Sequence, residues 1–231
     1  MNKQRGFTLI EIAIVLVIIG LLLGGVLKGQ ELITSARVRN LISQQDGVKA
    51  AYFGFLDRYR ALPGDYSQAA TNINCTPACQ NGNNNGRIET TTSGGALDEH
   101  IAAWEHLSKA GFINGSYTYA AGAETTASAP TNPYARYLRI AYDSNYGATT
   151  PTPALRHNLK TGNQVPSDLL AEIDRKIDDG NPLGGTFQFT DYNGGGSGGV
   201  QPQGGAANQC YLSTAWSAAT VDTNCGGASL F

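Results

Sequence analysis

The first strong pattern along the chain is an uninterrupted apolar run near its N-terminus. Residues 7–27 read FTLIEIAIVLVIIGLLLGGVL, in which Glu11 is the one charged side chain. A helix needs about 20 such residues to cross the hydrocarbon core of a bilayer. Lys3 and Arg5 precede the run, and basic flanks favour the cytoplasmic side. The pattern predicts one membrane-spanning helix with a cytoplasmic N-terminus and an exported remainder.

After the apolar run the hydrophobic positions become periodic. Apolar side chains recur every three to four residues, with Gln45 as a break, and Pro63-Gly64 supplies a stop signal. The positions are Val38, Leu41, Val48, Tyr52, Phe55, Tyr59 and Leu62. We predict one helix from Phe7 to Leu62, about 84 Å long at the usual rise per residue. Its second half should pack one face into a globular head.

Shorter helical patterns follow in the head. Residues 97–107 predict a helix with Ile101, Trp104 and Leu107 on one face. Its histidines, His100 and His106, are six positions apart, so they cannot face one ion and are expected to be solvated or accessory groups.

A second short helix is predicted over residues 167–179, with Ser167 as its cap and a glycine after its end. Asp174, Asp178 and Asp179 suggest a metal site or paired carboxylates. At this spacing, beside basic neighbours, we expect them instead on a solvated face.

The remaining head residues favour strands and loops. Residues 134–142 are rich in β-forming side chains, and residues 186–190 alternate between apolar and polar. Residues 191–209 are glycine-rich and are expected to form a flexible loop.

Composition narrows the function classes. The 231 residues allow one domain, or one domain plus an appendage, and 16 basic against 18 acidic residues give a net charge of −2. Nothing in this balance favours a polyanionic partner, so no nucleic-acid binding is predicted.

The cysteines form two close pairs in a chain that is expected to be exported. Three connectivities are possible, and the short loops favour Cys75–Cys79 and Cys210–Cys225. A zinc site is disfavoured because the first spacer is three residues long and the histidines show no ligand spacing with the second pair.

Residues 81–89, NGNNNGRIE, resemble the start of a calcium-binding loop. Oxygen-bearing side chains alternate, a glycine allows the sharp turn, and an isoleucine anchors the loop. The closing glutamate is missing, since the twelfth place is Thr92, and the alternative is an asparagine-rich turn without an ion. The predicted ligands of a weakly bound Ca²⁺ are Asn81, Asn83, Asn85, the Arg87 carbonyl, Glu89 and a more distant acid, Asp98 or Glu99.

The start of the apolar run is itself a motif. Gly6-Phe7-Thr8-Leu9-Ile10-Glu11 combines a short basic leader, a glycine, an aromatic residue and a glutamate at the fifth place after the glycine. This resembles the signal of type IV prepilins and type II secretion pseudopilins. A secretory signal peptide and an uncleaved anchor are the alternatives, but neither explains Glu11.

The resemblance implies a processing pathway. Prepilin peptidase would cleave between Gly6 and Phe7 and methylate the new amine of Phe7. That cation would lie about 6 Å of helix rise from Glu11, and Glu11 of one subunit could neutralise the Phe7 amine of its neighbour. An acid is costly in lipid without such a partner, and the pair would set the stagger between subunits.

The resemblance also implies a type IV pilin-like α+β fold, with a long N-terminal helix, an antiparallel sheet and short extra helices. The expected parts are a leader (1–6), a membrane and assembly half-helix (7–30), a head-packed half-helix (31–62) and a head (63–231). Within the head, the disulfide loop 210–225 is expected to be a contact surface. Trp216 is the residue to test there, with burial in the core as its alternative.

The leading functional prediction is a structural subunit that polymerises into an extracellular type IV pilus-like filament. The inner-membrane assembly machinery would build it from single-span precursors. The alternative is a pseudopilin of a type II secretion pseudopilus in the periplasm. An enzyme using the same anchor is a third class, but the sequence carries no nucleophile elbow, phosphate-binding glycine loop or closed histidine cluster. We therefore predict no enzymatic activity.

Overall fold

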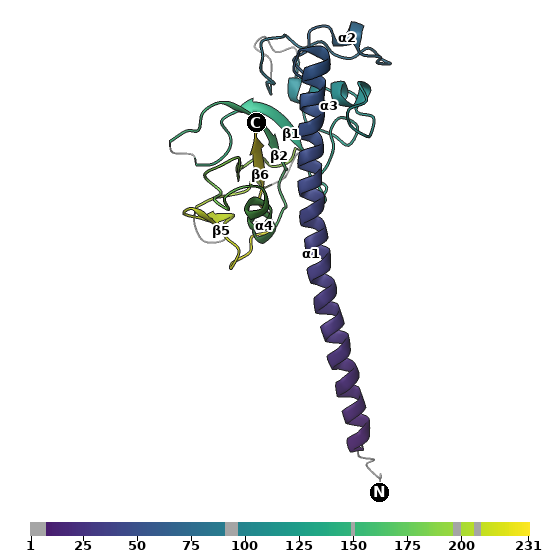
Figure 1. Cartoon of the computed structure of the whole chain (residues 1–231), viewed down its shortest axis with the longest axis vertical. Helices are drawn as coiled ribbons and strands as arrows, with labels where there is room; N and C mark the ends of the chain where they lie inside the picture. Colours follow the sequence, from purple (N-terminus) through teal and green to yellow (C-terminus); the bar gives the residue numbers. More distant parts are fainter. Residues whose placement is uncertain (1–7, 91–96, 149–150, 196–199, 206–208) are drawn as a thin grey trace. The chain divides into compact units, whose positions relative to one another are not determined.

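The computed structural model describes residues 8–90, 97–148, 151–195, 200–205 and 209–231. They belong to two compact units, Met1–Arg39 and Asn40–Phe231, and each unit is described by itself. Figure 1 labels the helices and most of the strands along the chain. The helices are α1 (Leu9–Tyr59), α2 (Ala69–Asn72), α3 (Glu99–Lys109) and α4 (Ser167–Ile177). The strands are β1 (Arg139–Asp143), β2 (Arg156–Lys160), β3 (Phe187–Phe189), β4 (Tyr211–Leu212), β5 (Ala215–Trp216) and β6 (Gly227–Leu230).

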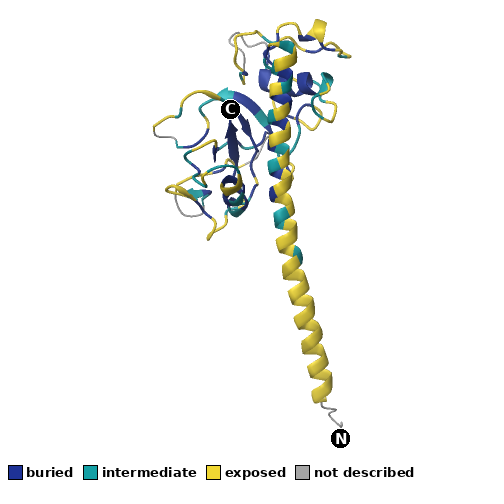
Figure 2. Cartoon of the chain, viewed as in Figure 1, coloured by how far each residue is buried: buried dark blue, intermediate teal, exposed yellow. Residues whose placement is uncertain are grey.

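The first unit consists of the N-terminal part of α1. Among the described residues, α1 is the helix that is long and apolar enough to cross a membrane, with a mean hydropathy of 2.8 in its most apolar window and none of that window buried. Figure 2 shows this part of the helix exposed. Side chains such as Leu9 and Leu21, which are 88% and 73% exposed, would be covered by lipid or by other helices.

The observed end of α1 differs from the predicted end. The helix stops at Tyr59 instead of Leu62, while Phe7, its predicted start, lies outside the described residues. Arg60 takes a left-handed backbone conformation with φ of 54°, and its N–H donates to the Leu56 carbonyl at 2.9 Å. This is a C-terminal capping conformation, so the chain leaves the helix before it reaches Pro63.

The head, in the second unit, contains a four-stranded antiparallel sheet in the order β1-β2-β6-β3. The C-terminal strand β6 therefore lies between β2 and β3, and Figure 1 shows it beside β2. A separate two-stranded pair, β4 and β5, lies inside the C-terminal disulfide loop. With α1, α3 and α4 these sheets make the pilin-like α+β fold that the sequence predicts.

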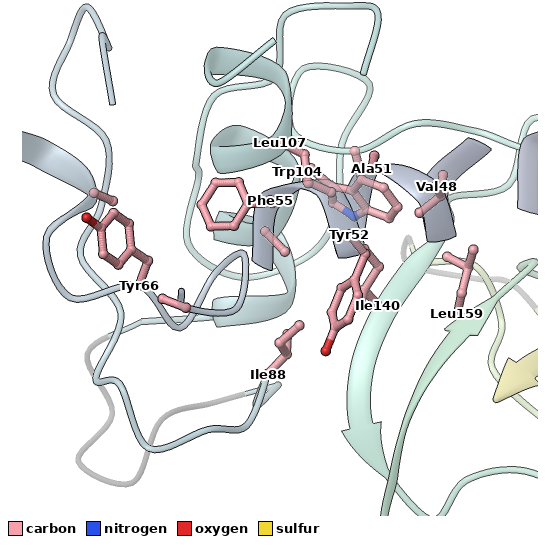
Figure 3. Close-up of a cluster of buried hydrophobic side chains, with 14 of the residues drawn as sticks. Val48, Ala51, Tyr52, Phe55, Tyr66, Ile88, Trp104, Leu107, Ile140 and Leu159 are labelled. Carbon is pink, nitrogen blue, oxygen red and sulfur yellow. The ribbon is translucent and has the colours of Figure 1, made fainter. Parts of the chain in front are cut away.

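The head core joins one face of α1 to α3 and the sheet. Figure 3 shows Phe55 and Tyr52 of α1 in one cluster with Trp104 of α3, Ile140 of β1 and Leu159 of β2. These side chains are at most 4% exposed. The predicted apolar face of the helix thus forms the core from Leu41 onward, which explains why the periodic pattern follows the uniformly apolar run.

Gln45, the break in that pattern, gives a first prediction. Its side chain is 1% exposed, and neither amide atom has a hydrogen-bond partner in the described part of the chain. An unsatisfied buried polar group costs about 1–3 kcal/mol. Gln45→Met keeps the length of the side chain and removes the polar atoms, so it should raise the free energy of unfolding by about 1 kcal/mol.

The adjacent residue is the matched control for this measurement. Gln44 donates from Nε2 to the Thr131 carbonyl at 2.8 Å, while its Oε1 has no partner in the described part of the chain, so Gln44→Met removes one hydrogen bond together with one unsatisfied atom. Denaturant unfolding of the full chain in detergent should therefore show a gain for Gln45→Met that Gln44→Met does not give. A loss of stability in Gln45→Met would contradict the prediction.

Candidate functional site

The first candidate site is the N-terminal turn of α1. The backbone N–H and the hydroxyl of Thr8 both donate to Glu11 Oε2 at 2.7 Å, and the Glu11 N–H donates to Thr8 Oγ1 at 3.3 Å. This reciprocal pattern is a capping box, in which each side chain satisfies a free N–H of the first turn. Gly6 and Phe7, the predicted cleavage and methylation residues, lie outside the described residues.

The capping box gives the carboxylate of Glu11 a definite position. It faces the N-terminal end of the helix, where the partial positive charge of the helix dipole also favours an anion. The sequence predicts a contact between Glu11 and a neighbouring subunit; the contact with Thr8 is additional to it, and Thr-x-x-Glu is its sequence signal. The same carboxylate thus caps its own helix within one chain.

The asparagine-rich loop is the second candidate. Its amide oxygens accept hydrogen bonds from backbone N–H groups: Asn81 from Ala70, Asn83 from Asn85, and Asn85 from Arg87, each at 2.9 Å. These are mostly short-range turn contacts, which asparagine commonly makes. The three oxygens are therefore already engaged within the protein.

The loop surrounds two buried carboxylates. Asp65 accepts from the N–H groups of Asn85 and Gly86 at 2.9 and 2.8 Å, and Glu99 accepts from those of Asn83 and Glu89 at 3.1 Å. Glu99 is thus brought to the loop, as the sequence predicts, whereas Asp65 has no sequence signal.

The electrostatics of this group favour a protonated acid. Burial raises the pKa of Glu99 to about 7, and the nearby charges of Asp65 and Glu89 add to the shift, while the hydrogen bonds from Glu89 and Asn83 oppose it. Burial also raises the pKa of Asp65, against three backbone hydrogen bonds. In this arrangement the loop directs N–H groups, and not only oxygens, toward the acids.

A third candidate is the acidic group at the end of α4. Ligand atoms of Asp174, Asp178 and Asp179 lie within 4.8 Å of one another, so the three carboxylates could bind a cation. The prediction of a solvated face is wrong for Asp174, which is fully buried. Its Oδ2 accepts from Trp216 Nε1 at 2.7 Å, and burial raises its pKa.

The cover over Asp174 comes from the C-terminal disulfide loop. Both predicted disulfides are present, with Cα–Cα distances of 5.5 Å for Cys75–Cys79 and 5.4 Å for Cys210–Cys225. Trp216 is 6% exposed, so the core alternative holds for this residue. The rest of residues 212–221, apart from Trp216 and Ser217, remains exposed.

The start of α4 also differs from the prediction. Ser167 is the first helical residue, and its side chain makes no cap hydrogen bond. Its hydroxyl donates to the Ser217 carbonyl at 2.7 Å and accepts from the Asp222 N–H at 3.0 Å. A tertiary contact with the disulfide loop has replaced the local cap.

The two histidines of α3 are buried, which corrects the expectation of solvated groups. His106 accepts at Nδ1 from the Gly64 N–H at 2.9 Å, and its Nε2 lies 2.7 Å from the Gln80 carbonyl. Since a carbonyl only accepts, the proton must be on Nε2 and the ring is neutral. Burial lowers the pKa of His106 to about 4.

His100 belongs to a separate buried polar group. Its Nε2 lies 3.5 Å from Glu124 Oε1, which also accepts from Arg139 Nε at 2.5 Å and from the Tyr192 hydroxyl at 2.9 Å. Burial, with a further contribution from Arg139, lowers the pKa of His100 to about 4. The pair of Glu124 and Arg139 supplies the charges here, and a neutral histidine packs beside it.

A prediction about pH follows from His106. The unfolded chain binds a proton near the usual pKa of 6.5, whereas the folded chain binds one only near 4. The contribution of neutral His106 to the free energy of unfolding is therefore complete above pH 6.5. It is lost as the pH falls toward 4, which lowers that free energy by up to about 3 kcal/mol. Unfolding of the full chain at pH 7 and at pH 4.5 measures this loss.

His100 and Glu99 make a comparison of variants necessary. Burial also lowers the pKa of His100 to about 4, so its contribution is lost over the same pH range as that of His106. Because the pKa of Glu99 is raised, its contribution is present below about pH 4.5 and is lost as the pH rises through 7. The quantity to follow is the difference between the wild type and His106→Gln at each pH. This difference should shrink on acidification, and a constant difference would show that His106 does not titrate as described.

Comparison with known proteins adds one match. Residues 1–27 match the prokaryotic N-terminal methylation motif. No curated protein and no solved structure matches the chain. The motif is typical of type IV pilins and pseudopilins, which are structural, non-enzymatic proteins. The motif, the exposed apolar helix that follows it and the α+β head are together similar to the arrangement found in type IV pilins.

Proposed function

We propose that the chain is a structural subunit of a type IV pilus-like extracellular filament. The methylation motif, followed directly by the exposed apolar part of α1, carries this proposal. Prepilin peptidase cleaves between Gly6 and Phe7 and methylates Phe7. The inner-membrane assembly machinery then polymerises the subunits through their N-terminal helices, and Glu11 of each subunit pairs with the Phe7 amine of a neighbour.

This proposal divides the chain by role. Residues 1–6 are the leader, residues 7–30 the membrane and assembly half of the helix, and residues 31–62 the half that packs into the head. Residues 63–231 form the head, which stays outside the inner membrane while the N-terminus faces the cytoplasm. After assembly, residues 7–30 exchange lipid for the helices of neighbouring subunits.

The mass of the mature N-terminal peptide tests the processing step. The expected product begins at Phe7 and carries one extra methyl group on its amine. A product that begins after Gly25 or Gly29 would identify a secretory signal peptide, and an intact Met1 would identify an uncleaved anchor. Either result would overturn the proposal.

A pseudopilin of a type II secretion pseudopilus uses the same N-terminal chemistry. The predicted calcium loop is the feature that favours it, whereas the size of the head and its C-terminal disulfide loop favour a pilus. Antibody labelling on extended surface fibres would support the pilus. Retention in the periplasm, with loss of secretion on deletion, would support the pseudopilus.

Calcium binding at the asparagine-rich loop is a further part of the proposal. The ion would have to replace the backbone hydrogen bonds that the amide oxygens now accept, which is consistent with weak binding. Calcium should raise the melting temperature of the full chain, and Asn83→Ala should abolish the rise. If Asp178→Asn abolishes it while Asn83→Ala does not, the acidic group at α4 is the site.

A further inference from the structure

The head contains a cleft of about 600 Å³ that none of the sites above uses. Its wall is formed by residues 144–148, 152–153, 189–191, 201–204, Gln209 and Tyr211. Ligand pockets in proteins usually measure roughly 300–1,000 Å³. The cleft is therefore large enough for a small organic ligand.

The wall combines aromatic rings with neutral polar side chains. Phe189 and Tyr211 contact each other in an edge arrangement, with ring centroids 5.0 Å apart. Gln201 and Gln203 are exposed beside them, and Gln209 is half-buried. Aromatic rings suit the C–H surface of a sugar ring, while amide groups both donate to and accept from hydroxyl groups.

Two hydrogen-bond acceptors of the residues in the wall lack a donor. Asp191 Oδ1 and Gln209 Oε1 are shielded from solvent and have no hydrogen-bond partner in the described part of the chain. A shielded acceptor without a partner is destabilising by about 1–3 kcal/mol. A ligand hydroxyl would supply the missing donor once these side chains turn toward it.

The charge of the wall excludes one class of ligand. Among the described residues that line the cleft, Asp191 is the one charged side chain and none is a lysine or arginine; Lys160, which interacts electrostatically with Asp191, lies outside this lining. An acidic ligand would approach a carboxylate without a basic partner in the lining, which is unfavourable. The lining therefore selects for neutral donors of hydrogen bonds.

The walls of the cleft are fixed by backbone contacts. The Gly147 N–H donates to the Phe189 carbonyl at 2.7 Å, and the hydroxyl of Thr190 donates to the Asn145 carbonyl at 2.8 Å. On the other side, the Cys210 N–H donates to the Gln203 carbonyl at 3.0 Å. Because the backbone is held in this way, only side chains such as Asp191 and Gln209 need to reorder when a ligand binds, which limits the cost of binding.

We propose that this cleft binds a neutral saccharide. Tyr211 and Phe189 contact the apolar surface of a sugar ring, and Asp191, Gln203 and Gln209 bind its hydroxyl groups. The inference does not depend on filament assembly, because every lining residue belongs to the head.

Binding can be tested with the full chain in micelles of a phosphocholine detergent, which has no sugar head group. Saturation-transfer NMR with lactose, cellobiose and N,N′-diacetylchitobiose should show transfer to at least one of them. Sialyllactose, which adds a carboxylate to lactose, should bind at least fivefold more weakly than lactose if lactose is bound. Absence of transfer to all three neutral sugars would overturn the proposal, as would preference for sialyllactose.

Variants locate the binding in the cleft. Gln203→Ala removes an exposed side chain, and Asp191→Asn retains the shape of the acid, so both should fold. Each should weaken binding of the retained sugar about threefold to tenfold, the range expected for one hydrogen bond. Gln80→Ala changes an exposed glutamine outside the cleft and should have no effect. Unchanged binding in both cleft variants would place the sugar elsewhere. Displacement of the sugar by an unrelated short peptide would make the cleft a peptide site. Either result would refute the proposal.

Discussion

Glu11→Gln should reduce incorporation of the chain into filaments at least tenfold while leaving the head as stable as in the wild type. Glutamine can replace glutamate in a capping box, so the contact with Thr8 can be kept. The negative charge that would neutralise the Phe7 amine of a neighbouring subunit is lost. Because an unpaired amine inside an apolar helix bundle is strongly unfavourable, assembly should fail although the helix remains intact.

Thr8→Val is the complementary control. It removes the hydroxyl that bonds to Glu11 but retains the charge of the carboxylate. Loss of one cap contact costs a helix about 1 kcal/mol, so Thr8→Val should assemble better than Glu11→Gln. Quantification of sheared or isolated filaments, normalised to subunit in the membrane, gives the comparison. If Glu11→Gln assembles normally, the charge has no role in assembly. Equal defects in both variants would contradict a specific role of the charge, because Thr8→Val retains it.

The long helix could be predicted from sequence because two simple patterns are superimposed on it. A continuous apolar run needs no tertiary information, and the later periodicity agrees with the buried positions from Leu41 to Phe55. The end of the helix was misplaced by three residues because Arg60 adopts a left-handed conformation, which is uncommon for arginine. Nothing in the local sequence indicates that conformation.

The sheet was only partly predictable. β1 and β3 overlap the predicted strands, whereas β2, with the sequence RHNLK, and β6, with the sequence GASL, have no clear alternating pattern. β2 is nevertheless mostly buried, since Lys160 pairs with Asp143 of β1 at 2.7 Å and Leu159 enters the core. Such burial depends on strand neighbours that are distant in sequence.

The candidate sites, like the strands, were predictable only where the sequence signal is local. The motif at Gly6, Phe7 and Glu11 is local and could be read directly from the sequence. The burial of Asp174 and His106 is not predicted from the sequence, which favours a solvated face for Asp174 and a solvated or accessory role for His106. The groups that bury them, Trp216 and the Gly64 and Gln80 backbones, come from distant segments. Local spacing gives the face of a helix but not what packs against that face.

Phe55→Ala should produce the largest loss of head stability among the substitutions considered, about 3–5 kcal/mol. Phe55 is fully buried, lies nearly parallel to the His106 ring at a centroid distance of 6.0 Å, and contacts Tyr59 at 4.5 Å and Phe112 at 5.9 Å. Truncation removes these contacts and leaves a cavity where α1 meets α3. Since whole domains are stable by only about 5–15 kcal/mol, much of the head would unfold near physiological temperature.

Phe53→Ala is the matched control two residues earlier on the same helix. Phe53 is 51% exposed, and its ring contacts are with Tyr52 and Phe231. Its truncation should cost only about 1 kcal/mol, the scale of an aromatic pair. Denaturant unfolding of the full chain in micelles, followed by the near-ultraviolet signal of the head, measures both variants. Similar losses for the two would show that the core does not centre on Phe55. A large loss for Phe55→Ala alone would establish that the second half of α1 is a structural part of the head. For any α1 variant that fails to assemble, unfolding of the head must then be excluded as the cause.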